Sequence, residues 1–336
     1  MGEVKSMQPE ARGSAHLTRS LSPFNQFLSD PTISEICVNT PGIVFVERMG
    51  AAHMERYEVP EATNTTLIGL ARLLAGKSNQ AINEEKPLLS TTLPTGERIQ
   101  IVMPPASPTG VALSIRKQVV NDLSLDDYKR SGSFENVGII RDSLAREQDT
   151  ELLALIEGQR IQDFLSLAVK KRKNIVVSGG TSTGKTTFLN AILKEVGEFE
   201  RIITIEDTAE VKPPQLNWLS LIASKGGQGK AKVTIQSLLE ASLRLRPDRI
   251  LLGELRGAEA YTFLRAVNTG HPGSITTVHA DTPRRALDQI TLMVLQADLG
   301  LNRDEILEYI RSIVDCVIQL RRVDGVRKIS EIWWPE

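Results

Sequence analysis

The stretch GGTSTGKT, at residues 179–186, constrains the fold of this chain more than any other feature. It matches the phosphate-binding pattern GxxxxGK(S/T), and it stands between an apolar run of the strand type (174–178) and a run of the helical type (186–196). In that context, glycines let backbone N–H groups converge on phosphate oxygens at the start of a helix. An ordinary glycine-rich turn is the alternative, but both flanking elements are of the type that the phosphate loop requires. The motif therefore predicts a nucleotide-binding domain.

The C-terminal half alternates short apolar runs with longer runs of the helical type. Besides the strand before the loop, strands are expected at 201–205, 249–253 and 274–278, with edge strands at 316–322 and 328–334. Helices are expected at 152–171, 186–196, 234–245, 258–270, 283–296 and 303–314. Short β-branched strands separated by helices are typical of a parallel sheet covered on both faces. We therefore assign this half to the α/β class, with a sheet in which parallel strands dominate.

The N-terminal half mixes strands with one helix and lacks strict alternation. Strands are expected at 33–39, 42–48, 97–104 and 111–117, and an amphipathic helix at 62–80. This pattern predicts a smaller α+β domain. The chain has 336 residues, more than one ordinary core needs. We divide it into a mobile tail (1–20), the α+β domain (21–124), a polar linker (125–149) and the nucleotide-binding domain (150–336).

Composition excludes several classes of protein. The formal net charge of −1 lacks the basic excess of a dedicated nucleic-acid binder, so direct DNA binding is not expected. The two cysteines, Cys37 and Cys316, lie far apart and cannot form a structural zinc site. No apolar run reaches the roughly 18 residues of a spanning helix, and the N-terminus lacks a signal-peptide core. We therefore expect a cytoplasmic protein.

Polar residues follow the other predicted strands. Glu206 and Asp207 follow the strand at 201–205, Glu254 follows 249–253, and His279 follows 274–278. Ligands of open parallel sheets bind beyond the carboxyl ends of the strands, so these side chains should meet the phosphate loop at one edge. Taken singly, each has an ordinary structural explanation, but their convergence favours a functional site.

The residue types suggest ATP hydrolysis assisted by Mg²⁺. Lys185 would neutralise the β- and γ-phosphates, and Thr186 would offer its hydroxyl to Mg²⁺. Glu254 would activate or orient the attacking water, and His279 would sense the γ-phosphate. An Asp usually precedes such a Glu and coordinates the metal, but Gly253 stands there. Its substitute is expected to be Glu206 or Asp207, with Glu210 a weaker third candidate.

The remaining candidate residues are those of the phosphate loop and a second histidine, His271. The residues expected to bind nucleotide through the loop are Gly179, Gly180, Thr181, Ser182, Thr183, Gly184, Lys185, Thr186 and Thr187. His271 precedes the turn that feeds the strand ending at His279. Six strand residues at about 3.3 Å each separate the two rings by roughly 20 Å, so we expect His271 to lie away from the phosphates.

Four blocks of sequence resemble the secretion ATPase superfamily, and most of all the type IV secretion and conjugation traffic ATPases, the VirB-eleven family. The blocks are GGTSTGKT, TIEDTAEV, LRLRPDRILLGELRGAEA and GHPGSITTVHA. The segments ISEICVN, LPTGERIQIVMPP and SIRK resemble the N-terminal domain of that family. By this resemblance, the Asp box holds Glu206, Asp207 and Glu210, the second nucleotide-binding motif holds Glu254, and the His box holds His271 and His279.

The resemblance implies a hexameric ring with a RecA-like ATPase domain and ATP held between the two domains of each subunit. It also implies docking on other components of a type IV secretion system, including other ATPases, at the cytoplasmic face of a bacterial inner membrane. There ATP hydrolysis would power transfer of a protein or nucleoprotein, or pilus assembly. Arg98 and Arg116 match N-terminal arginines that approach the nucleotide phosphates, although surface salt bridging is an equal alternative. Arg244, Arg246 and Arg256 would serve the same site or a neighbouring subunit.

Other classes stay open at this point. The type II secretion ATPases typically carry a four-cysteine zinc module, which this chain cannot build; pilus-retraction ATPases are the nearer rival. A nucleotide-dependent scaffold without turnover, or a small-molecule kinase, would also carry a phosphate loop. Glu254 favours hydrolysis over passive binding, and no lid insertion of the kinase type is evident in the nucleotide-binding half.

Overall fold

The N-terminal domain is built on one antiparallel sheet. The computed structural model describes residues 16–117, 130, 149–224, 231–324 and 326–335. Within them, six strands pair in the order β3-β2-β1-β6-β5-β4. Their bounds are β1 Ile33–Thr40, β2 Ile43–Arg48, β3 Glu55–Glu58, β4 Leu88–Thr92, β5 Arg98–Val102 and β6 Ala112–Arg116. Helix α3 (Asn64–Lys77) buries its leucines against this sheet, which confirms the predicted α+β character.

The C-terminal domain contains a seven-stranded sheet in the order β13-β12-β7-β11-β10-β8-β9. Every neighbouring pair is parallel except β12 with β13. The strands are β7 Ile175–Gly179, β8 Ile202–Glu206, β9 Trp218–Ile222, β10 Arg249–Leu252, β11 Ile275–Val278, β12 Cys316–Val323 and β13 Val326–Trp333. The α/β assignment is thus confirmed, except that β12 lies inside the sheet and only β13 forms that edge.

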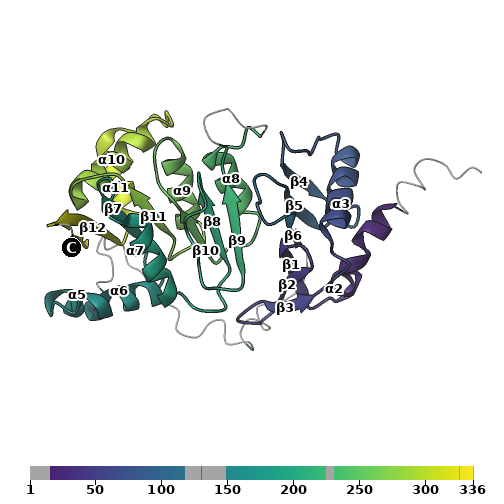
Figure 1. The fold of residues 1–336 in the computed structure, drawn as a ribbon, viewed down its shortest axis with the longest axis horizontal. Coiled ribbons are helices and arrows are strands. Elements are labelled where there is room, and N and C mark those ends of the chain that lie inside the picture. Colours follow the sequence, from purple (N-terminus) through teal and green to yellow (C-terminus); the bar gives the residue numbers. More distant parts are fainter. Residues whose placement is uncertain (1–15, 118–129, 131–148, 225–230, 325, 336) are drawn as a thin grey trace, which may run out of the picture.

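Helices cover both faces of this sheet because its strands are apolar on both sides (Figure 1). One face packs against α8 (Ile235–Ser242), α9 (Glu259–Asn268), α10 (Pro283–Leu295) and α11 (Arg303–Ile313). The other packs against α5 (Thr150–Glu157), α6 (Ile161–Lys170) and α7 (Lys185–Ile192). Alternate residues of β7 enter the two cores: Val176 lies in the first, and Ile175 and Val177 lie in the second. In the described ranges no helix is long and apolar enough to cross a membrane.

Several elements differ from the sequence prediction. The single helix expected at 152–171 is two helices, because the chain turns at Gln159, whose φ is +57°. Strands β3, β4 and β9 were not predicted; each is an edge strand, and β3 and β4 carry mostly exposed or partly exposed residues. Residues 16–20, placed in the predicted tail, are helical, and Leu17 is buried in the N-terminal core. Residues 1–15 of that tail, and most of the predicted linker at 125–149, lie outside the described residues.

The two domains meet along β9, at one edge of the large sheet (Figure 1). Arg201, which precedes β8, is fully buried at this contact. Its guanidinium donates to the side-chain oxygens of Asn39 and Asn217, each at 2.6 Å, and to the carbonyl of Leu245 at 2.9 Å. Asn39 belongs to the N-terminal domain and the other two acceptors to the C-terminal domain. One buried arginine therefore bonds the domains together.

Replacement of Arg201 by Met should destabilise the domain contact. The apolar side chain leaves buried acceptors on both domains without a donor, which costs about 2 kcal/mol and lowers the thermal midpoint by about 5 °C. Circular dichroism melting of the full chain measures this shift. Arg303→Met is the matched control, because Arg303 forms an exposed ion pair with Asp288 whose loss should matter little. Equal midpoints for the two variants would contradict the assignment.

Candidate active site

A cavity of about 410 Å³ lies at the carboxyl ends of the parallel strands. Strands β7, β8, β10 and β11 all end at it, as the sequence predicted. Its lining residues come from the phosphate loop, the segments after these strands and the β12–β13 hairpin. They are Ser182, Thr183, Gly184, Lys185, Thr186, Thr187, Glu206, Asp207, Thr208, Glu210, Ile235, Gly253, Glu254, Arg256, Thr277, His279 and Arg327.

The phosphate loop wraps around the start of α7. Gly184 takes φ +88° and Ser182 takes φ +61°, so the backbone turns back on itself before the helix begins at Lys185. The Lys185 ammonium donates to the carbonyls of Gly179 at 2.9 Å and Gly180 at 3.3 Å. Burial lowers the pKa of Lys185, and the nearby Glu254 carboxylate acts against this shift. Two neutral carbonyl groups thus hold the Lys185 ammonium across the mouth of the loop. A phosphate anion bound there would attract the ammonium more strongly than these carbonyls do.

Thr186, the predicted metal ligand, faces a carboxylate from another element. Its hydroxyl donates to Glu210 Oε2 at 3.1 Å. The Asn190 side chain of α7 holds the same segment by donating to the Glu210 carbonyl at 3.1 Å and accepting from the Lys212 N–H at 2.7 Å. The structure therefore places Glu210 beside Thr186, although the sequence ranked it behind Asp207.

Glu206 lies at the end of β8 and is almost completely buried. Its Oε1 accepts backbone N–H bonds from Glu210 at 3.0 Å and Val211 at 2.9 Å, which shapes the segment that carries Glu210. Its Oε2 is buried and has no hydrogen-bond partner in the described part of the chain. Burial raises the pKa of Glu206, and the two N–H bonds oppose this.

Gly253 explains how Glu206 reaches the cavity. A Cβ atom at Gly253 would lie 3.2 Å from Glu206 Cγ, closer than ordinary van der Waals contact. A side chain at position 253 would therefore require the Glu206 side chain to shift by a few tenths of an ångström. This is a physical reason for the glycine at the position where the sequence pattern usually has a metal-binding Asp.

Glu254 lies between a cation and an imidazole. Its Oε2 accepts from the Arg256 guanidinium at 2.7 Å, and its Oε1 lies 3.4 Å from His279 Nε2. Arg256 also forms an ion pair with Asp207, and its pKa is raised mainly by the Glu254 bond. Asp207 thus orients Arg256, and no bond from Asp207 to Thr186 is present. The predicted Glu254 and His279 are brought together, whereas the predicted metal ligand Asp207 is engaged elsewhere.

The predicted N-terminal arginines lie in a different place. Arg98 and Arg116 pair directly across β5 and β6, and they line a second cavity of about 650 Å³ together with Arg172, Arg244, Arg246 and His271. This cavity lies at the amino ends of the parallel strands, between the two domains. Within one chain, Arg98 and Arg116 therefore do not line the phosphate-loop cavity, because the N-terminal domain packs along β9 and places them near the amino ends of the parallel strands.

The other predicted residues divide between the two cavities. Arg256 lines the phosphate-loop cavity. Arg246 bonds Glu47 across the domain contact and also Asp248. His271 donates through its Nδ1–H to the Pro247 carbonyl at 3.0 Å, far from His279 along the strand, as predicted. No sequence motif pointed to Arg327, which lines the phosphate-loop cavity from the C-terminal hairpin.

The fold and the first cavity define an α/β protein with a phosphate loop of the kind that binds nucleotides. The profile of the family described as "Type II/IV secretion system protein" matches residues 18–328. The type IV secretion system protein VirB11 of Bartonella henselae is 41% identical over 327 residues, which cover 94% of this chain and 91% of that protein. VirB11 of Brucella suis is 41% identical over 323 residues, covering 94% and 89%.

A solved structure agrees with these sequence matches. The crystal structure of the VirB11 ATPase from the Brucella suis type IV secretion system, in complex with sulphate, superposes with a TM-score of 0.88 at 39% identity and covers 96% of both chains. This chain therefore belongs to the type II/IV secretion system protein family, and within it to the VirB11 ATPases of type IV secretion systems. The resemblance noted in the sequence is confirmed, and the alternative hypothesis of a small-molecule kinase is not supported.

Replacement of Glu206 separates its structural bonds from its charge. Glu206→Ala leaves the backbone N–H groups of Glu210 and Val211, the second of them buried, without an acceptor and should cost about 2 kcal/mol of stability. Glu206→Gln keeps an oxygen in the position of Oε1 and should melt close to the wild type. Differential scanning calorimetry compares the three proteins, and an alanine variant as stable as the wild type would show that the carboxylate does not hold the 210–211 segment.

Proposed function

We propose that this protein is a Mg²⁺-dependent ATP hydrolase that works as a hexameric ring in a type IV secretion system. Its hydrolysis would power transfer of a protein or nucleoprotein substrate, or pilus assembly, at the cytoplasmic face of a bacterial inner membrane, where it would dock on other system components, including other ATPases. One observation carries the hydrolytic part: Glu254 and the phosphate loop share one cavity at a single sheet edge. Family membership supports the type IV secretion setting.

The cavity residues divide the work of phosphoryl transfer to water. Loop N–H groups and Lys185 bind the phosphates, with the ammonium leaving its two carbonyl partners for the γ-phosphate side. Glu254 orients the attacking water, since it stands at the end of β10, two strands away from β7, and lines the same cavity as the loop. His279, beside Glu254, donates to the γ-phosphate and reports its loss. Arg256 holds Glu254 in place.

The donors around Thr186 fit a magnesium ion. When bound, Mg²⁺ neutralises phosphate charge and takes hard oxygen ligands, keeping several waters. Thr186 would supply its hydroxyl, and Glu210 and the unpartnered Glu206 Oε2 would accept from metal-bound waters. No three His, Cys, Asp or Glu side chains of the described residues gather into a metal-binding cluster of their own. Asp207 was expected from the sequence to be a metal ligand, and its role is now to orient Arg256.

The two cavities suggest how a ring would complete the active site. A head-to-tail ring brings different surfaces of neighbouring subunits into contact. The arginine-lined cavity of one subunit lies on the sheet edge opposite its own phosphate loop, so it is available to a neighbour. We infer that Arg98 and Arg116 act on the phosphates of an adjacent subunit. Domain movement would then follow nucleotide state, because loss of the γ-phosphate removes an ion partner.

The first test is direct. Lys185→Ala should abolish ATP hydrolysis by removing the charge that binds the phosphates, and Glu254→Gln should abolish hydrolysis while nucleotide still binds. A phosphate-release assay with and without Mg²⁺, together with fluorescent nucleotide binding, measures both. The control is Glu240→Gln, on the exposed surface of α8. Hydrolysis by Glu254→Gln at the wild-type rate would refute the assigned role.

The second test mixes two inactive proteins. Lys185→Ala subunits and Arg98→Ala/Arg116→Ala subunits should each be inactive alone. Mixed in equal amounts and reassembled, about a quarter of the sites should combine an intact loop with intact neighbouring arginines, and activity should return. A mixture as inactive as its components would show that the arginines do not act across the subunit boundary. Ring formation is checked in the same samples by light scattering.

A further inference from the structure

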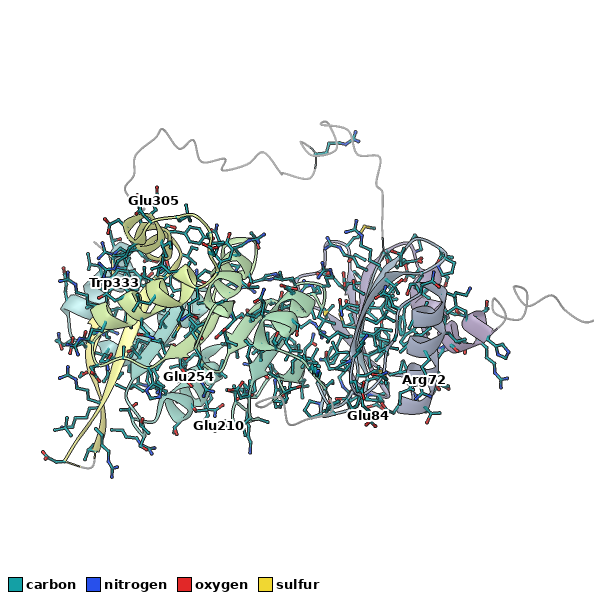
Figure 2. The ribbon with its side chains drawn as sticks, turned by 90° about the horizontal axis from the view of Figure 1, so that it is seen from above. Arg72, Glu84, Glu210, Glu254, Glu305 and Trp333 are labelled. Carbon is teal, nitrogen blue, oxygen red and sulfur yellow. The ribbon has the colours of Figure 1, made fainter. Side chains whose placement is uncertain are left out.

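The C-terminal hairpin reaches past the end of the phosphate-loop strand. β12 runs parallel to β7, with Cys316 opposite Ile175 and Leu320 opposite Gly179. It continues to Val323, so the hairpin turn lies beyond the point where β7 ends and the loop begins. Figure 2 shows the yellow hairpin extending beyond the sheet on the side where Glu210 and Glu254 lie. A strand pairing far along the chain therefore delivers hairpin residues to the nucleotide cavity.

Arg327, the second residue of β13, lies directly against the phosphate loop. A Cβ atom at Gly184 would stand 2.7 Å from Arg327 Cδ and 3.1 Å from Nε. Any side chain at position 184 would therefore collide with the arginine, in addition to straining the φ of +88°. The glycine before Lys185 thus serves two purposes: it turns the loop, and it lets the Arg327 side chain lie across it.

The charges of the cavity leave Arg327 free for a ligand. Three Lys or Arg side chains line it: Lys185, Arg256 and Arg327. Lys185 bonds two loop carbonyls, and Arg256 bonds two carboxylates. Within the described ranges, the Arg327 guanidinium has no hydrogen bond or ion pair. An unpartnered guanidinium at a phosphate loop is suited to a phosphate oxygen, with which it can form charge-assisted hydrogen bonds.

We propose that Arg327 is a phosphate-binding residue of the same subunit and that it contacts the α- and β-phosphates, which ATP and ADP share. This proposal rests on the proposed nucleotide site. In a loop of this kind, the backbone N–H groups cradle the α- and β-phosphates, whereas the lysine reaches toward the γ-phosphate. Arg327 lies over Gly184 of that backbone, and Glu254 and His279 mark the γ side. Through Arg327, the hairpin therefore binds both ATP before hydrolysis and ADP after it.

The test measures ADP binding rather than turnover. The full-length protein is titrated with fluorescent ADP and with a fluorescent non-hydrolysable ATP analogue, for the wild type and for Arg327→Gln. Loss of charge-assisted bonds should weaken the Kd for both nucleotides by about tenfold. Arg327→Lys, which keeps the charge without the fork of donors, should lose less. Equal melting temperatures establish that the exposed substitutions leave the fold intact.

Lys328→Gln is the matched control. Lys328 is the next residue on β13, is exposed, and points to the opposite face of the strand. Its replacement therefore removes the same charge at nearly the same distance from the nucleotide. Its Kd values should stay within about twofold of the wild type. Unchanged ADP affinity in Arg327→Gln, a loss confined to the ATP analogue, or an equal loss in Lys328→Gln would each overturn the proposal. Absent hydrolysis in the wild type would instead refute the proposed function, and ADP binding would still test Arg327.

Discussion

Parallel hydrogen bonding between β7, β11, β10 and β8 is the constraint on which the rest of the structure depends. Because these strands run in one direction, all their carboxyl ends meet at one edge of the sheet. That edge collects the phosphate loop, Glu206, Glu254 and His279, while the arginine-lined cavity lies at the amino ends of the same strands. With four or five residues at about 3.3 Å each, the strands separate the two cavities by roughly 15 Å. The sheet thus holds the phosphate-loop cavity and the arginine-lined cavity at opposite ends of its strands.

Strand β8 connects the domain contact with the phosphate-loop cavity. At its start, the buried Arg201 bonds the N-terminal domain through Asn39. At its end, Glu206 holds the backbone of the segment that brings Glu210 to Thr186. A five-residue strand therefore joins the domain contact to the predicted metal side of the cavity.

The sequence predicted the features that local pattern determines. The phosphate loop, the polar strand ends and the separation of His271 from His279 all follow from strand direction and spacing. Edge strands β3 and β4 escaped prediction because most of their residues are exposed or partly exposed, so that pairing rather than an apolar pattern defines them. Strand β9 was also not predicted, although its Leu219 and Leu221 are buried. The roles of Glu210 and Arg327 depend on contacts between segments at least 24 residues apart, which no spacing rule reveals. Arg98 and Arg116 were matched by resemblance, but only the packing of the domains shows which cavity they line.

Charge balance connects these separate findings. The phosphate-loop cavity contains four carboxylates, Glu206, Asp207, Glu210 and Glu254, against three Lys or Arg side chains. A polyphosphate entering this cavity adds further negative charge in a partly buried place, where uncompensated charge is costly. The chain by itself offers Lys185 and the unpartnered Arg327, and Arg256 is already neutralised. Tight binding of the triphosphate therefore requires cations from outside, which Mg²⁺ and the arginines of a neighbour would supply. Under the proposed function, nucleotide affinity would then depend on ring assembly, because the described residues of one subunit leave this cavity short of positive charge.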